Sequence, residues 1–199
     1  MPFLDEDAGV VLTPYRAEWQ DEYADLAETL RTLELSPEGM IEHVGSTSIP
    51  GLTSKDVIDA QIRVPELDTE LVIGRFSVAG FRQRPEPWNN LEPTRLGVYP
   101  KLVFAPPLGA RHANVHVRAN GSPGAHDTLL FRDFLRVEDE PRRLWSELKE
   151  SILRDDPEVD LLSYGQTKQV AWLELMVDAD KWALEHEWRP RPLLAWTSI

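Results

Sequence analysis

The 199-residue sequence contains no cysteine. Disulfide bonds, thiolate metal sites and a cysteine nucleophile are therefore excluded. The chain also lacks any apolar run near the ~18 residues that a membrane-spanning helix requires. Its first ten residues, MPFLDEDAGV, are acidic and do not have the basic and then apolar layout of a signal peptide. Together these absences predict a cytoplasmic protein without membrane association.

Positive charge is scarce as well. There are 21 lysines and arginines against 34 aspartates and glutamates, which gives a formal net charge of −13 at pH 7. A surface of this sign repels nucleic-acid backbones, so we expect no bulk nucleic-acid binding. A local basic pocket can still hold a small anion, and the charge therefore leaves nucleotides open as ligands. The sequence does not define the oligomeric state.

The periodicity of apolar residues predicts the secondary structure. Helices are expected at residues 17–35, 66–79, 127–136, 140–155 and 158–187, and short strands at 10–13, 40–44, 57–64, 81–84, 98–105 and 113–118. Two segments rich in proline, glycine and other turn formers predict a loop at 84–97 and a turn at 121–127.

This order of elements, a few strands with one crossover helix and then a run of helices, is typical of an α+β fold rather than a doubly wound parallel sheet. No flexible linker divides the chain, so we expect one domain. Its sheet part spans about residues 10–120 and its helical part about 123–188. Residues 1–9 and 189–199 are predicted to be loose tails.

Two of the predicted strands alternate between apolar and polar side chains. The first places Asp59, Gln61 and Arg63 on its polar side, and the second places His112, Asn114, His116 and Arg118 there. This pattern predicts a sheet that packs one face on a helical core and turns the other toward a ligand cleft. The alternative is a face simply exposed to water, which is common in antiparallel sheets.

A Gly45-Ser46 turn follows the strand at 40–44 directly. Glycine lets the backbone approach a ligand closely, and the hydroxyls of Ser46 and Thr47 with the charge of Lys55 suit a phosphate group. The alternative is an ordinary turn between a strand and a loop. Asp59 favours the functional interpretation, because aspartate is disfavoured in the middle of a strand.

The motifs EHVGSTSIPGLTSKDVID, NVHV, LLFRDFLR and YGQTKQ occur in this order between Val11 and Trp182. They resemble the GrpB family (UPF0157), a group of small bacterial proteins assigned to the nucleotidyltransferase fold. The resemblance implies a nucleotidyltransferase-like mixed sheet with helices on one face and C-terminal helices that close a cleft. In that superfamily a Gly-Ser turn precedes an Asp-x-Asp or Asp-x-Glu pair, which binds the divalent metal that bridges the nucleotide phosphates.

Carried over to this chain, Gly45 and Ser46 match the turn and Asp59 matches the first acid. The position of the second acid is Gln61. A carboxylate and a neutral amide hold Mg²⁺ more weakly than two carboxylates do. A third acid could come from Glu42 or Glu92, but the spacing does not require either.

We expect His116, Arg132 and Lys168 to orient or neutralise a bound nucleotide, and the resemblance supports this for Lys168, because basic residues of the helical half often do so in nucleotidyltransferases. Arg132 and Arg136 share one helix face, and their alternative role is a surface ion pair with Asp133 or Glu140. Lys168 is equally consistent with a solvated lysine.

The leading hypothesis is a protein that binds an NTP with Mg²⁺ and transfers a nucleotidyl group to an unidentified acceptor, with Asp59 as catalytic residue and metal ligand. The alternative is a non-catalytic module, a degenerate transferase that binds a nucleotide or another phosphorylated metabolite. A third hypothesis is a phosphate-ester hydrolase that uses Asp59 with the histidines. A metal site made of His43, Asp59 and His116 would require their strands to be neighbours.

Overall fold

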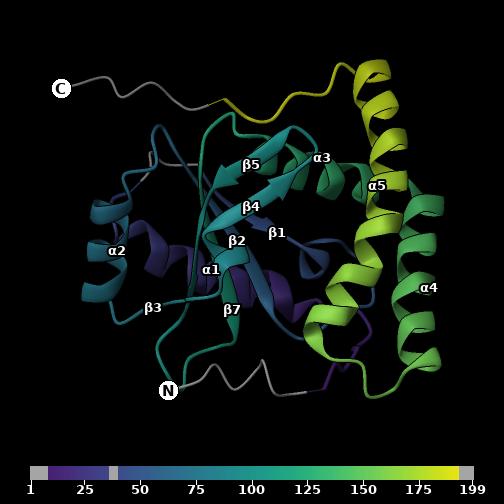
Figure 1. Ribbon diagram of the computed structural model, residues 1–199, viewed down its shortest axis with the longest axis horizontal. Coiled ribbons are helices and arrows are strands. Elements are labelled where there is room, and N and C mark those ends of the chain that lie inside the picture. Colours follow the sequence, from purple (N-terminus) through teal and green to yellow (C-terminus); the bar gives the residue numbers. More distant parts are fainter. Residues whose placement is uncertain (1–8, 36–39, 193–199) are drawn as a thin grey trace.

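The computed structural model describes residues 9–35 and 40–192. Its strands are β1 (Ile41–Val44), β2 (Ile58–Val64), β3 (Arg82–Gln83), β4 (Leu91–Thr94), β5 (Gly97–Pro100), β6 (Leu102–Ala105) and β7 (Ala113–Ala119). Its helices are α1 (Glu18–Arg31), α2 (Thr69–Val78), α3 (Pro123–Val137), α4 (Asp139–Asp155) and α5 (Leu161–Glu185), with short 3₁₀ turns η1 (Ser46–Ser48) and η2 (Pro87–Asn89). The predicted α+β class is confirmed (Figure 1).

Five strands form one mixed sheet in the order β1-β2-β7-β6-β3, and β4 and β5 form a separate hairpin. β2 and β7 are parallel neighbours, whereas β1, β6 and β3 are each antiparallel to the strand they join. The chain leaves β2 through α2 and returns in β7, as a parallel pair requires a crossover connection.

The apolar sides of β2 and β7 face α1 and α2, as their alternation predicts. Ala60 and Val115 are both fully buried there against Leu30 and Phe76. The ring of Phe76 also stacks on Phe104, with ring centroids 3.9 Å apart. This core holds β2 and β7 rigidly, and their polar sides consequently lie on the opposite face of the sheet.

The three C-terminal helices pack around a second core that contains Phe134, Trp145, Met176 and Trp182. In Figure 1, α4 and α5 lie side by side at the right of the view, and α2 lies at the left. Leu52, from the loop between β1 and β2, is buried in the same core. The helical part is thereby fixed against the loop that follows the Gly-Ser turn. No helix in the described ranges is long and apolar enough to cross a membrane.

The predicted loop at 84–97 and strand at 98–105 are wrong in part. The structure instead contains the β4–β5 hairpin, and residues 98–105 are divided between β5 and β6. Gly97, at φ 126°, closes the two-residue turn between the paired residues Thr94 and Gly97. Proline and asparagine obscured this hairpin, because a β4–β5 ribbon outside the main sheet tolerates proline at its edges.

Two further expectations need correction, and a third falls largely outside the described residues. The predicted turn at 121–127 is the start of α3, where Ser122 caps the helix through the backbone N–H of Ala125 and Pro123 takes the first helical position. The predicted strand at 10–13 is reduced to a single bridge between Thr13 and Ser54. Residues 1–8 and 193–199 of the predicted tails lie outside the described ranges.

Candidate anion-binding site

The parallel pairing of β2 and β7 brings the two polar rows together. In register are Asp59 with Asn114, Gln61 with His116, and Arg63 with Arg118. The sequence alternation indicated each row separately, and the pairing joins them into one polar face. The two ends of this face are built differently.

The far end of the polar face is closed by what we call the arginine network, made of Gln61, Glu92, Lys101 and Arg118. Arg118 donates two hydrogen bonds to the Glu92 carboxylate at 2.6 and 2.8 Å, and its Nη1 donates to Gln61 Oε1 at 2.8 Å. Lys101 Nζ lies 3.1 Å from Glu92 Oε1. Burial alone would raise the pKa of Glu92, but Arg118 and Lys101 outweigh it and lower this pKa to about 2.

Gln61 is therefore a structural residue, and its predicted role as a metal ligand needs correction. Its side chain is fully buried, its amide nitrogen donates to the Ala125 carbonyl at 3.3 Å, and its amide oxygen already accepts from Arg118. The two optional acids are also engaged. Glu92 belongs to the arginine network, and Glu42 forms an ion pair at 2.6 Å with the buried Arg63.

At the opposite end, near the start of β2, lies a cavity of about 150 Å³ that we call the lysine pocket. Its lining residues come from the Gly-Ser turn, the loop before β2, the starts of β2 and β7, and the helices α4 and α5. They are Ser46, Ser54, Lys55, Val57, Asp59, Asn114, Lys149, Tyr164 and Lys168. Three lysines thus face a single carboxylate.

Gly45 sets the close approach between the turn and Asp59. Its φ is +67°, and a side chain there would place its Cβ 2.9 Å from the Cβ of Asp59 and still closer to Oδ2. Only glycine fits this position without displacing Asp59. The same turn directs Ser46 into the lysine pocket.

Asp59 is held by two neighbours on β7. Asn114 Nδ2 donates to Asp59 Oδ1 at 3.1 Å, and His116 Nε2 lies 3.7 Å from the same oxygen. Burial opposes ionisation of Asp59, but His116, Asn114 and the charge of Lys55 outweigh it and lower the pKa. The carboxylate is therefore ionised at neutral pH.

Lys149 reaches the lysine pocket from α4. Its side chain is buried, and Nζ donates to Ser46 Oγ at 3.2 Å and to the carbonyl oxygen of Thr53. Burial is the main cause that lowers its pKa to about 7, the charge of Lys168 lowers it further, and Glu150 opposes both. Its hydrogen-bond acceptors are neutral, so its charge is not compensated by them.

Lys168 enters the lysine pocket from α5. Its Nζ lies 4.3 Å from the centroid of the Tyr164 ring and 6.0 Å from that of Trp145, which are cation–π distances. Burial lowers its pKa to about 8, with Lys55 adding to this shift and Asp59 opposing it. Within the described ranges, no carboxylate lies at ion-pair distance from Lys149 or Lys168.

The structure thus brings together Ser46, Lys55, Asp59 and Lys168 of the predicted site, with Gly45 behind them. It does not bring the others into the lysine pocket. His116 lies behind Asp59, where burial lowers its pKa. Thr47 is fully buried, and its hydroxyl lies 3.0 Å from His43 Nε2.

Arg132 also lies away from the lysine pocket, contrary to the prediction. Its guanidinium binds the His43 carbonyl at 3.1 Å and Asp133 at 2.7 Å. Arg136 similarly donates to the Ser48 carbonyl at 2.8 and 3.0 Å. Both arginines therefore anchor α3 to the backbone around the Gly-Ser turn.

Sequence reasoning missed Lys149 entirely, although a signal was present. Trp145, Lys149 and Ile152 recur at helical spacing and are the buried residues of α4. A lysine on the apolar side of an amphipathic helix is unusual, because a buried ammonium group is costly unless it is compensated. The alternation placed Asn114 on the polar face, but its position beside Asp59 follows only from the strand pairing. Ser54 lies in the loop before β2, where no sequence pattern indicated it.

The lysine pocket does not have the donor set of a divalent metal site. In phosphate sites Mg²⁺ is held by one or two carboxylates together with the substrate phosphates and water. Here Asp59 is the one carboxylate among the lining residues, and three lysines beside it would repel a cation. Across residues 9–35 and 40–192, no three His, Asp or Glu side chains are grouped to hold a metal ion. The Mg²⁺ clamp that the resemblance implies does not fit these residues, and neither does a site built from His43, Asp59 and His116.

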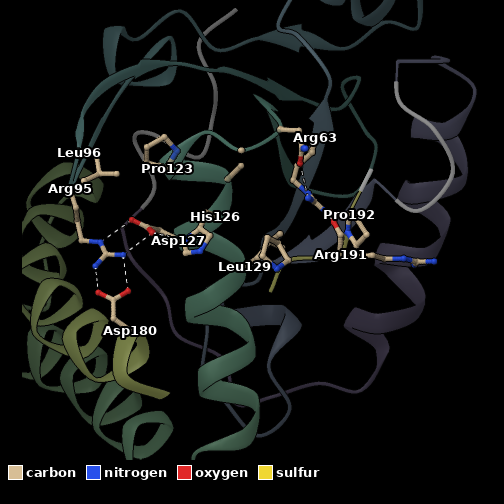
Figure 2. Close-up of a pocket in the computed structure, with 14 residues that line it drawn as sticks. Arg63, Arg95, Leu96, Pro123, His126, Asp127, Leu129, Asp180, Arg191 and Pro192 are labelled. Atoms are coloured by element: carbon tan, nitrogen blue, oxygen red, sulfur yellow. Dashed lines mark hydrogen bonds and ion pairs between the residues drawn. The ribbon is translucent and has the colours of Figure 1, made fainter. Parts of the chain in front are cut away.

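A second, larger cavity of about 500 Å³ lies between α3, the β4–β5 turn and residues 190–192. Figure 2 shows that its main cation, Arg95, points between two carboxylates. Arg95 binds Asp127 at 2.8 and 3.0 Å and Asp180 at 2.5 and 3.2 Å. Arg95 is thus already paired with acids, whereas no carboxylate of the described ranges lies at ion-pair distance from Lys149 or Lys168, and we assign anion binding to the smaller lysine pocket.

The sequence model of the GrpB protein family matches residues 9–178, and the chain belongs to this family. A UPF0157 protein of Streptomyces coelicolor is 31% identical over 159 residues, which is 79% of this chain and 77% of that protein. Among the first four curated relatives, the matched share of the relative ranges from 77% down to 46%.

Among solved structures, conserved protein GrpB from Enterococcus faecalis superposes with a TM-score of 0.68 at 21% identity, over 90% of this chain and all of that one. This agreement confirms the fold. The Cid1 poly(U) polymerase superposes less well, with a TM-score of 0.46 at 14% identity over 69% of this chain and 45% of that chain.

Proposed function

We propose that the protein binds a nucleotide, or another phosphorylated small molecule, by holding its phosphate groups in the lysine pocket. The observation that carries this proposal is the convergence of Lys55, Lys149 and Lys168 on one cavity that contains a single carboxylate. Ser46 adds a hydroxyl beside Lys149. Ammonium and hydroxyl groups are the donors that bind phosphate oxygens.

The setting of these lysines supports a ligand rather than a purely structural role. The chain carries a net charge of −13, so three lysines in one cavity run against the overall field. Holding the buried Lys149 on neutral acceptors and the partly desolvated Lys168 beside aromatic rings costs free energy. A phosphate group would supply the missing negative charge and offset that cost. The small size of the cavity also suits phosphate better than a nucleic-acid strand.

Between the two nucleotide hypotheses, the non-catalytic module is favoured. Nucleotidyl transfer in the superfamily uses a metal held by paired acids, and the lysine pocket has one acid with Gln61 turned away. Nucleotidyl transfer remains the second candidate, because an ionised Asp59 beside the Gly45-Ser46 turn preserves one half of that arrangement. The hydrolase hypothesis is not favoured, since His116 lies behind Asp59 rather than in the lysine pocket.

Isothermal titration with ATP, GTP, CTP and UTP in the presence of Mg²⁺ tests the proposal. We expect saturable binding by the wild type. Replacing Lys168 with methionine should weaken it roughly ten- to hundredfold, the usual worth of a hydrogen bond to a charged group. Lys181→Met is the matched control, because Lys181 lies on the same helix, is exposed and pairs with Asp178.

Equal losses in both lysine variants would reject the lysine pocket as the binding site, and no binding by the wild type would reject a nucleoside triphosphate as the ligand. Turnover separates the two candidates. Pyrophosphate release from an NTP that is lost in Asp59→Asn would support nucleotidyl transfer. Binding without any release would support the module.

A further inference from the structure

The charged side chains that line the lysine pocket are of the kind that binds an anion directly, without a metal ion. A metal–phosphate complex is bound by carboxylates through the metal, whereas a free phosphate chain is bound by cations directly. Here the lining has three lysines and one aspartate. The positive groups are therefore built into the chain rather than supplied by a divalent ion.

The two candidate acids, Glu92 and Glu42, are held away from Asp59 by arginines. Arg118 binds Glu92 as well as the Gln61 amide, and the Arg63 side chain that binds Glu42 is only 2% exposed. Releasing either acid would leave an arginine buried without its partner, which is strongly unfavourable. The arginine network and the Arg63–Glu42 pair thus keep these two acids out of the pocket.

The available oxygens of the pocket are also engaged by donors. Asn114 Oδ1 accepts a hydrogen bond from Arg84 Nε at 2.9 Å, and Ser46 Oγ accepts from Lys149 at 3.2 Å. Asp59 Oδ1 accepts from Asn114. A cation placed here would meet donors on nearly every side, whereas an anion would find Lys149 and Lys168 without a carboxylate partner.

From this arrangement we propose that the lysine pocket binds the phosphate chain of its ligand without a divalent metal, with Lys55, Lys149 and Lys168 in the place that Mg²⁺ takes in metal-dependent sites. The inference rests on the proposed function and extends it to the chemical form of the ligand. The ligand class is a free polyphosphate ester, such as a nucleoside triphosphate without its metal.

The test compares ATP and inorganic triphosphate, each titrated as the sodium salt, in EDTA and in MgCl₂. We expect the affinity in EDTA to equal that in MgCl₂ within about threefold, or to exceed it. The reason is that Mg²⁺ bound to the phosphate chain reduces the negative charge that the lysines attract. Binding that appears only with Mg²⁺ would overturn the inference and leave the proposed function standing. No binding of either probe in either buffer would overturn both.

Asp59→Asn gives a second test, because the inference and a metal-ligand role of Asp59 predict opposite changes in ATP affinity. In EDTA the variant should bind ATP at least as tightly as the wild type, because a negative charge next to the phosphates is removed. If Asp59 held a metal, the variant would instead lose affinity in MgCl₂, and this loss would overturn the inference. Ser163→Asn, on the exposed start of α5, serves as the surface control, and unchanged circular dichroism and Tm establish that Asp59→Asn is folded.

Discussion

At the start of β2 the polar face of the sheet borders three lysines, whereas four residues further along the same strand it carries arginines that are paired with acids. Desolvation is the main cause of the depressed pKa values of Lys149, which is buried, and of Lys168, which is half-buried, and within the described ranges neither has a carboxylate at ion-pair distance. Arg118 is as buried as Lys149, but Glu92 compensates its charge. Removing the acid from a buried arginine is strongly unfavourable, whereas the uncompensated charge of a desolvated lysine would be offset by an anionic ligand.

The comparison also decides between the two cavities. In the larger one Arg95 is paired with both Asp127 and Asp180, as Figure 2 shows. The lysine pocket has less than a third of that volume, about 150 against about 500 Å³, but Lys149 and Lys168 have no carboxylate at ion-pair distance within the described ranges. Charge compensation, rather than volume, distinguishes a structural cavity from a candidate binding site.

Breaking the arginine network should have the largest effect on stability. Arg118→Met leaves Glu92 and Gln61 buried without their partner, and we expect the free energy of unfolding to fall by about 3–5 kcal/mol. Urea denaturation measures this change. Arg143→Met, on the exposed surface of α4, is the matched control and should change the free energy of unfolding very little, because exposed ion pairs contribute little. A small loss in Arg118→Met together with lost ATP binding would place Arg118 in the binding site instead.

The arginine network also makes the stability of the fold depend on pH. The pKa of Glu92 is lowered in the folded state, from 4.5 to about 2. Its contribution to stability is therefore present above pH ~4.5 and is lost as the pH falls toward 2. Arg118→Met should remove this part of the acid dependence, which a urea series at decreasing pH would detect.

Next in size is a steric change at the Gly-Ser turn. Gly45→Ala adds a Cβ that collides with Asp59 and forces alanine to φ +67°, and we expect a loss of about 1–3 kcal/mol with weaker ATP binding. Gly51→Ala is a close control, because Gly51 has φ +79° but no atom within 4 Å of the added Cβ. The difference between the two variants isolates the collision with Asp59. Equal losses would show that only backbone strain matters.

These contacts show which parts of the site the sequence could predict. The alternation in β2 and β7 correctly placed Asp59 and Asn114 on a polar face, because side-chain direction follows from a local period of two. It could not reveal that the two strands are parallel neighbours, since four other strands lie between them in the sequence. The orientation of Gln61 was equally hidden, because Arg118 approaches it from another strand.

The helical part shows the same limit. The period of apolar residues located all three C-terminal helices, but it could not say which polar residue reaches across to the loop before β2. Arg132 and Lys168 both fitted a role in the cleft, and only the packing of α3 and α5 separates them. Arg132 binds a backbone carbonyl, whereas Lys168 lines the lysine pocket.

A moderate effect is expected from neutralising Lys149. Its pKa falls from 10.5 to about 7 on folding, so the unfolded chain binds more protons between these values. Burying the charged Lys149 therefore lowers the free energy of unfolding by its full amount below pH ~7, and by progressively less as the pH rises toward 10.5. Lys149→Met should therefore unfold at higher urea than the wild type, with the largest gap at pH 6 and a smaller gap at pH 9. A gap that grows with pH would contradict the depressed pKa.

Anion affinity should decrease as the pH rises, whereas the stability contribution of Lys149 increases. Lys149 and Lys168 are charged below about pH 7 and 8, so sulfate, whose own charge is constant over this range, should bind more tightly at pH 6 than at pH 9. Lys149→Met should show lower affinity and a flatter pH profile. An equally steep profile in the variant would assign the pH dependence to other groups.

The smallest effect is expected at position 61, where the superfamily pattern predicts that a second acid would greatly strengthen Mg²⁺ binding. Gln61→Glu restores a carboxylate at the second acid position, yet the new side chain would face Arg118 rather than Asp59. Mg²⁺ should consequently raise the Tm of the variant no more than that of the wild type. Ser54→Asp places a carboxylate inside the lysine pocket itself and is the matched comparison, for which a gain in Mg²⁺ response is expected. A gain in Gln61→Glu would mean that the arginine network opens, and the contrast between the two ends of the sheet would then not hold.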